Sequence, residues 1–257
     1  MTYSKVLSSF FLFILVCISL VSCIAYHYVP STPYVPLNTQ KGELKLNLSY
    51  NCYQIGYSLS DRFSVFSTGF HRVNTYHSIL EKEGSGSDSG GDEFYDYSIG
   101  GSYFKSINSI TYELLGGIGY GSNYFHHHKD LYYYDFEINS NKTSYYIQPD
   151  IGVKFNEYSE MSLFSRFIGC HYYNMRTNGD FRNGKSIDPS DSYFVGRKSL
   201  DLYFIEPGLM CRAGFKHFKL EFSGMTAFSL NNSMIVYQSI HLNVSAYLNL
   251  NLFKEKK

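Results

Sequence analysis

The sequence predicts an all-β protein, an antiparallel up-and-down transmembrane β-barrel of about ten strands, with eight as the alternative count. The stretch that carries this prediction is residues 236–253, where apolar and polar residues alternate strictly. Ile240, Leu242 and Val244 share one face, and His241 and Asn243 share the other. A soluble strand usually has about five or six residues, whereas a membrane-crossing strand needs roughly 9–11. This stretch is long enough to cross a membrane.

The composition agrees with this class. Aromatic residues make up 18% of the 257 residues, with 26 Tyr, 21 Phe and no Trp. Membrane barrels carry aromatic girdles at both rims, although those girdles often include Trp. The formal net charge is zero, which excludes a general electrostatic attraction to nucleic acid.

The amino terminus has the pattern of an export signal. Lys5 precedes an apolar run, residues 6–21, which has the length of a signal-peptide core and is short for a membrane helix. The run ends in Leu20-Val21-Ser22-Cys23, which resembles a bacterial lipobox. We therefore expect residues 1–22 to be a lipoprotein signal peptide and Cys23 to be the lipid attachment site. The alternative is an ordinary signal peptide followed by a chance cysteine.

Residues 23–42 contain Pro30, Pro33 and Pro36 and are predicted to form an extended tether. The barrel is expected to cover residues 43–253, and a charged tail residues 254–257. The cysteines beyond the signal, Cys52, Cys170 and Cys211, form neither a disulfide framework nor a metal motif.

Alternation predicts the barrel strands one after another. The expected strands cover residues 43–48, 53–59, 63–70, 94–104, 110–121, 146–154, 160–172, 204–212, 218–223 and 236–253. From the second strand onward, short turns alternate with longer stretches at 71–93, 122–143 and 173–199. Membrane barrels have this arrangement, with short turns in the periplasm and long loops outside.

The long stretches are expected to be solvated polar loops. They include the Gly- and Ser-rich residues 84–92 and three adjacent histidines, His126 to His128. Adjacent histidines would share a metal ion only in a loop, because a strand sends neighbours to opposite faces. We expect no metal and no cofactor.

Two strands resemble each other, one carrying Gln148-Pro149 and the other Glu206-Pro207. Proline removes a donor from a sheet ladder, and a β-bulge at each position would accommodate it.

Ionisable residues recur on the polar face of the strands, and both signs occur in comparable number. A small barrel holds little water, so buried charges must pair with one another. The predicted lumen network consists of Glu113, Asp150, Lys154, Arg166, Glu206, Arg212, Lys219 and Glu221. Glu206 and Arg212 are too far apart on one strand to pair, which leaves Arg166, Lys219 and Glu221 as candidate partners. The network predicts a plugged barrel.

The chain resembles the small outer-membrane β-barrel proteins of Gram-negative bacteria, most closely the lipobox-bearing kind found in Bacteroidota. The lipobox, the glycine-rich residues 115–121 and the Gln148-Pro149 strand carry the resemblance. It implies contact with outer-membrane lipid and handling by the barrel-assembly and lipoprotein-processing machinery. The residues after Cys23, Ile24-Ala25-Tyr26, lack the acidic run of a surface-export signal. We therefore expect outer-membrane localisation with the lipid anchor on the periplasmic side.

A structural or interaction role through the outer loops is the favoured function, with the binding partner undefined. We expect no catalytic site. One alternative is an outer-membrane lipid-modifying enzyme, in which His241 would act with Ser239 or Asn243, and a narrow pore is another. A soluble, lipid-anchored barrel of lipocalin type, with its apolar face inward, is a further alternative.

Overall fold

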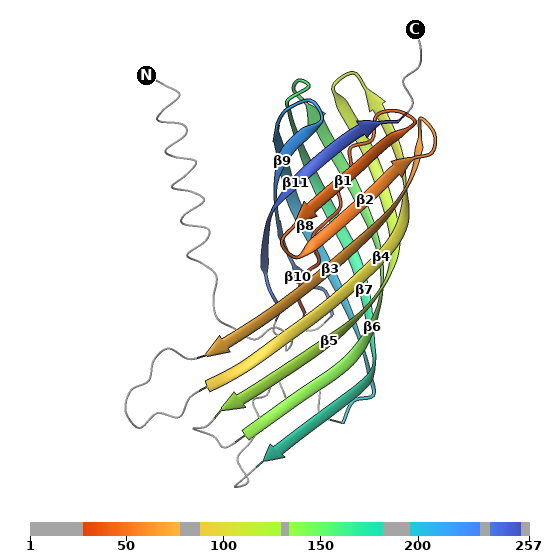
Figure 1. Ribbon diagram of the computed structural model, residues 1–257. Coiled ribbons are helices and arrows are strands. Elements are labelled where there is room, and N and C mark those ends of the chain that lie inside the picture. Colours follow the sequence, from red (N-terminus) through yellow and green to blue (C-terminus); the bar gives the residue numbers. More distant parts are fainter. Residues whose placement is uncertain (1–27, 78–87, 130–133, 182–195, 232–236, 253–257) are drawn as a thin grey trace.

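The computed structural model describes residues 28–77, 88–129, 134–181, 196–231 and 237–252 (Figure 1). The predicted signal peptide, Cys23 and the charged tail lie outside these residues. The described chain contains no helix that is long and apolar enough to cross a membrane.

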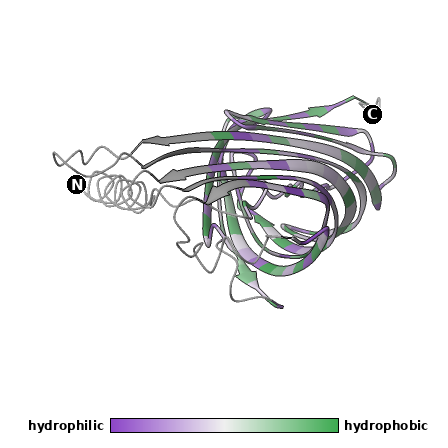
Figure 2. Ribbon diagram, turned by 90° about the horizontal axis from the view of Figure 1, so that it is seen from below, coloured by the Kyte–Doolittle hydropathy of each residue, from purple (hydrophilic) through white to green (hydrophobic). Residues whose placement is uncertain are grey.

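Within the described residues, ten antiparallel strands close into a barrel, as predicted (Figure 2). Each strand pairs with the next one along the chain from β1 to β9; β9 pairs with β11, and β11 pairs with β1. The strands are β1 Glu43–Ser49, β2 Cys52–Ser58, β3 Phe63–His77, β4 Asp88–Ile107, β5 Ile110–Lys129, β6 Tyr134–Lys154, β7 Ser159–Phe181, β8 Ser199–Gly214, β9 Phe218–Thr226 and β11 Ile240–Asn251. A further two-residue strand, β10 (Phe228–Ser229), continues along β8 in the register of β9.

The two ends of the barrel differ. We call one the turn end, because residues 59–62, 108–109, 155–158 and 215–217 connect neighbouring strands there. Both the start of β1 and the end of β11 lie at this end, since Glu43 is opposite Asn251. At the far end, β3 to β7 run well beyond β1, β2 and β11 (Figure 1).

This extension corrects the predicted loops. Residues 71–77, 88–93, 122–129, 134–143 and 173–181 belong to strands rather than loops. Alternation identified only the part of each strand whose outer face is apolar, because the extension is polar outside. His126 to His128 lie on β5.

Neither proline carries a bulge. Pro149 stays in register opposite Leu114 of β5, and the ladder between β6 and β7 omits residues 148 and 149. Pro207 lies where the neighbour of β8 changes from β9 to β10. The register shift that is present lies between Asn139 and Asn141.

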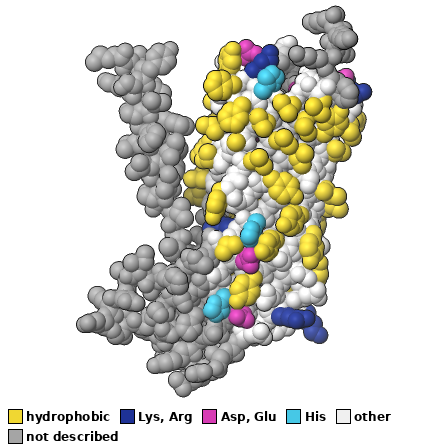
Figure 3. Space-filling model, in the orientation of Figure 1, with side chains coloured by type: hydrophobic (Ala, Val, Ile, Leu, Met, Phe, Trp, Pro, Cys, Tyr) yellow, Lys and Arg dark blue, Asp and Glu magenta, His cyan; other side chains and the backbone are white. Residues whose placement is uncertain are grey.

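The inner and outer faces of the barrel wall differ in polarity. On β11, Leu242 and Val244 are exposed, whereas His241, Asn243 and Ser245 are buried in the lumen. Exposed aliphatic and aromatic side chains cover much of the outside of the barrel, and charged and histidine side chains appear at the turn-end rim and again nearer the far end (Figure 3). The predicted faces of this strand are therefore confirmed.

Candidate functional site

The lumen is occupied by the chain's own amino-terminal segment. Residues 28–38, which we call the strap, have no regular secondary structure, and all but Ser31 are buried inside the barrel. The sequence predicts an extended tether at this position. The structure shows that its described part runs through the barrel.

The proline spacing suits the strap to this place. Pro30, Pro33 and Pro36 recur every third residue, which is the period of a polyproline II helix. Such a chain makes no internal hydrogen bonds, and each proline lacks the N–H group that would need a buried acceptor. The strap therefore has more carbonyl acceptors than N–H donors, and a buried carbonyl needs a donor.

Donors from the barrel wall meet these carbonyls along the whole strap. Lys45 Nζ donates to Pro36 O at 2.7 Å and to Leu37 O at 2.6 Å. The remaining donors are Arg166 to Ser31 O at 2.8 Å, Gln54 to Thr32 O and Pro33 O at 3.0 Å each, Gln148 to Tyr34 O at 2.8 Å, and Arg212 to Val35 O. The wall thus recognises the backbone of the strap as much as its side chains.

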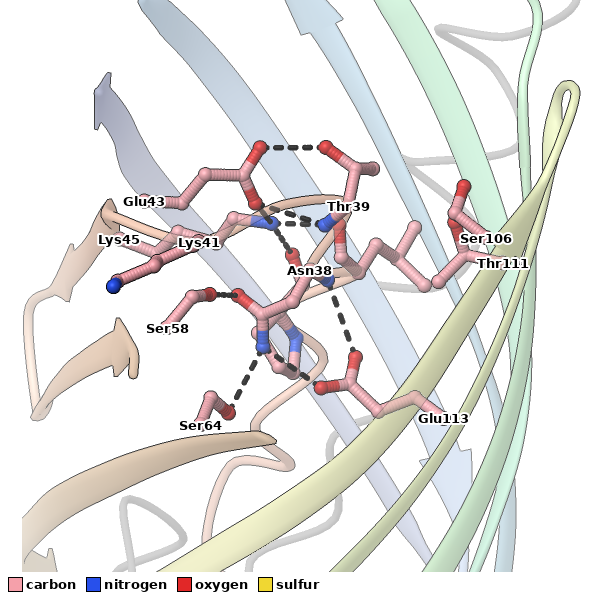
Figure 4. Close-up of polar contacts among 12 residues, drawn as sticks. Asn38, Thr39, Lys41, Glu43, Lys45, Ser58, Ser64, Ser106, Thr111 and Glu113 are labelled. Atoms are coloured by element: carbon pink, nitrogen blue, oxygen red, sulfur yellow. Dashed lines mark hydrogen bonds and ion pairs between the residues drawn. The ribbon is translucent and has the colours of Figure 1, made fainter. Parts of the chain in front are cut away.

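At the turn end, Asn38 fixes the strap to three wall residues (Figure 4). Its Nδ2 donates to Glu113 Oε1 at 2.8 Å and to Ser64 Oγ at 3.0 Å, and its Oδ1 accepts from Ser58 Oγ at 3.0 Å. Thr39 then donates through both its backbone N and its Oγ1 to Glu43. The strap therefore enters β1 through a corner that these hydrogen bonds fix.

At the other end of the strap, Tyr28 joins a buried ion pair. Arg166 Nε lies 2.6 Å from Glu206 Oε2, and Tyr28 Oη donates to Glu206 Oε1 at 2.7 Å. The Tyr28 ring stacks on Phe204 with the ring centroids 3.9 Å apart. Glu206, with 0% of its surface exposed, thus has a partner for each carboxylate oxygen.

A second buried cluster centres on Arg212. Its Nε lies 2.6 Å from Glu221 Oε2 and its Nη1 lies 3.1 Å from Glu160 Oε1. The guanidinium also lies over the Tyr247 ring, 3.8 Å from the centroid, and Lys219 contacts Glu160 at 3.4 Å. Alternating signs around one cation allow this cluster to remain charged while buried.

Two glycines of the wall make room for strap side chains. A Cβ atom on Gly56 would lie 1.9 Å from Tyr34 Oη, and one on Gly152 would lie 2.4 Å from a Leu37 methyl group. Any larger residue at either position would force the Tyr34 or Leu37 side chain to move. The wall therefore has the shape of this particular segment.

The structure buries seven of the eight residues of the predicted network: Glu113, Asp150, Arg166, Glu206, Arg212, Lys219 and Glu221. The eighth, Lys154, is wrong as a lumen residue, because it is exposed at the end of β6. Glu206 and Arg212 each pair with a neighbouring strand, through Arg166 and Glu221, which are two of the three candidate partners. Asp150 accepts from Gln148 at 3.1 Å.

Sequence reasoning missed several lumen residues. Glu160 joins the Arg212 cluster, and Lys142 forms a buried ion pair with Asp96. Lys142 was missed because it falls in a stretch expected to be loop. The correct signal was its position in an alternating run, with Ser140 and Ser144 also buried.

His241 does not form a catalytic arrangement. Its Nε2 lies 3.2 Å from Thr32 Oγ1 of the strap, and its ring meets Phe70 edge-on. Ser239 is exposed, whereas His241 and Thr32 are both buried where a substrate would not reach them. This histidine positions the strap.

Among the described residues, no group of three His, Cys, Asp or Glu side chains is arranged to hold a metal ion. No model of a known protein family matches the chain, and no curated protein matches it in sequence. The inference about function therefore comes from the barrel, its outer surface and its filled lumen.

Proposed function

We propose that this protein is an outer-membrane β-barrel lipoprotein whose lumen is closed by its own strap, and that it has a structural or interaction role. The polar extension of the barrel wall at the far end would face the outside of the cell. The observation that supports membrane embedding best is the apolar belt, by which we mean the exposed apolar side chains around the barrel.

The height of the apolar belt fits a membrane. On β5 it runs from Ile110 to Tyr120 and on β11 from Ile240 to Leu250, with exposed apolar side chains facing outward. Ten residues of strand extend about 34 Å, and a tilt of roughly 40° reduces this to about 26 Å along the barrel axis. Membrane barrels carry an apolar band of about 25 Å.

Aromatic residues border the apolar belt on both sides. Exposed Tyr97, Tyr120, Tyr145 and Tyr203 border it towards the far end. Exposed Phe63, Tyr103, Tyr112 and Phe218 border it towards the turn end. Aromatic rings prefer the two membrane–water interfaces, so these rows fit the girdles of a membrane barrel. Under this orientation, the turn end faces the periplasm.

The alternatives fit the geometry less well. A lipocalin-type barrel holds its ligand in an apolar interior, whereas Glu206, Arg212 and Lys45 are buried in this interior and the exposed face is apolar. A pore needs a continuous water path, and the strap occupies that path. A lipid-modifying enzyme needs reactive groups that a substrate can reach, and His241 is buried out of such reach.

Lipid exposure is tested by charging the apolar belt. Val244 is 64% exposed in the middle of β11, so Val244→Arg is expected to destabilise the membrane barrel by about 2–4 kcal/mol. In a soluble barrel the same change would leave stability almost unaltered, because the arginine would face water. The measurement is the fraction of folded, heat-modifiable barrel in membrane extracts.

A matched control is Ser239→Arg, a change at an exposed residue just beyond the apolar belt on the same chain segment, which should be tolerated. Wild-type levels of folded barrel for Val244→Arg would contradict lipid exposure.

Lipid attachment at Cys23 is a separate prediction. The lipobox motivates it, and metabolic labelling with a clickable fatty acid should mark the wild-type protein but not Cys23→Ala. Equal labelling of both proteins would reject acylation at this residue.

A further inference from the structure

The strap runs through the barrel in a defined direction. At one end Tyr28 O accepts from Gln238 N at 3.0 Å, just before β11 begins at Ile240. At the other end Gly42 O accepts from Leu252 N at 3.0 Å, just after β11 ends at Asn251. Residues 28–42 therefore cross the barrel over the full length of β11, from the far end to the turn end.

This path limits where the preceding residues lie. Four residues separate Cys23 from Tyr28, so the two Cα atoms are five residue steps apart, and five steps extend at most about 17 Å. The apolar belt that they would have to cross is about 25 Å high. The strap also fills the lumen, which leaves no second path back through the barrel. Cys23 therefore cannot return to the turn end.

We propose that the barrel threads its own amino-terminal segment, so that the chain before Tyr28 leaves on the far side of the membrane from the short turns. This inference rests on the proposed function, under which the far side is the cell surface. A lipid on Cys23 would then anchor in the outer leaflet. The sequence predicts periplasmic anchoring because no acidic run follows Cys23. It gives no indication that residues 28–38 lie inside the barrel.

The contacts with wall side chains favour a threaded segment rather than a loose tether. Tyr28, Thr32, Val35 and Asn38 contact the wall at successive levels, through Glu206, His241, Arg212 and Glu113. Gly56 and Gly152 leave space for Tyr34 and Leu37 between these levels. A segment held at every level of the lumen has one register and one direction.

The test uses two tagged forms of the full-length protein. One carries an epitope between Tyr26 and His27, and the other carries it between Asn108 and Ser109, in the β4–β5 connection at the turn end. Antibody binding is compared between intact cells and cells with a permeabilised outer membrane. Heat-modifiable migration is recorded for both forms, to establish that each has formed a membrane barrel.

Threading predicts that the epitope before Tyr28 is bound on intact cells and that the epitope at Asn108 is bound only after permeabilisation. If both require permeabilisation while both barrels are heat-modifiable, threading is wrong and the membrane barrel stands. If neither form is heat-modifiable and the untagged protein is not either, the proposed function fails and threading across a membrane fails with it.

A second measurement is independent of the membrane. Thr32→Cys and His241→Cys, combined in a variant whose Cys52, Cys170 and Cys211 are replaced by serine, should be joined by a short bifunctional thiol reagent in the detergent-purified protein. The reagent is needed because it must span the space that the His241 ring fills, which is too wide for a direct disulfide. Thr32→Cys with Val244→Cys is the control, because Val244 faces outward. Cross-linking of both pairs or of neither pair would contradict a strap held inside the barrel.

Discussion

Replacing the strap, residues 28–38, with a Gly/Ser segment of the same length is expected to convert a non-conducting barrel into a conducting one. The strap occupies the lumen over the length of β11, and its carbonyls accept from Arg166, Arg212 and Lys45. A Gly/Ser segment keeps backbone carbonyls, but it loses the prolines that fix an extended backbone and the side chains that hold the strap at Glu206, His241 and Glu113, so it would no longer stay in the lumen. The freed cations would then be hydrated, and water would follow the path that the strap leaves. Planar-bilayer recordings should show little current for the wild type and sustained current for the variant.

Two controls sharpen this experiment. A synthetic peptide of residues 28–42, added to the variant, should restore the low current, because the wall recognises the extended backbone. Gly56→Leu keeps the strap sequence but places a side chain where the Tyr34 hydroxyl lies, and it should raise the current on its own. A variant without the strap that conducts no more than wild type would mean that wall side chains alone close the lumen.

The sequence predicted the closed barrel well because its strands carry one repeated physical signature. Apolar side chains recur at every second residue, and this pattern is visible in 110–121 and 236–253 without any knowledge of neighbours. The extension at the far end is mostly polar on its outer face, so its strands lack that signature. Residues 122–143 were therefore predicted to be loop, although most of them are strand.

The strap could not be located from the sequence. Its prolines predict an extended chain, and an extended chain is equally compatible with a tether in solvent and with a segment inside a barrel. What distinguishes the two is the set of donors that converge on its carbonyls, including Gln54 and Gln148 from β2 and β6. Those residues meet only when the barrel closes, so no local pattern shows the site.

The charge pairs were easier to predict from the sequence than the position of the strap. Arg166 and Glu206 lie on strands that follow each other in the chain, and an up-and-down barrel makes such strands neighbours. Lys154 was misplaced because its alternation phase is correct but its position at the end of β6 takes it out of the lumen. The alternation pattern predicts whether a side chain points into or out of the barrel. Whether that side chain is buried also depends on how far the residue lies from the end of the barrel, which only the three-dimensional structure shows.

Glu206→Gln is expected to destabilise the barrel by about 3–5 kcal/mol, because it leaves the buried Arg166 guanidinium without its counter-ion. The neutral amide also replaces a carboxylate that accepts from both Arg166 and Tyr28. The measurement is the urea midpoint of unfolding in detergent micelles. Glu157→Gln is the matched control: Glu157 pairs with Lys216 at 3.5 Å on the surface, and its loss should change the midpoint little.

The double variant Glu206→Gln with Arg166→Met distinguishes two effects: the loss of the ion-pair attraction, and the cost of leaving the Arg166 charge buried without a partner. Removing both members of a buried pair is often nearly neutral, because neither charge is then desolvated without a partner. We therefore expect the double variant to recover most of the stability that Glu206→Gln loses, less the hydrogen bonds that Arg166 makes to Ser31. If the double variant is no more stable than Glu206→Gln alone, then the main role of Arg166 is to hold the strap through Ser31 rather than to neutralise Glu206.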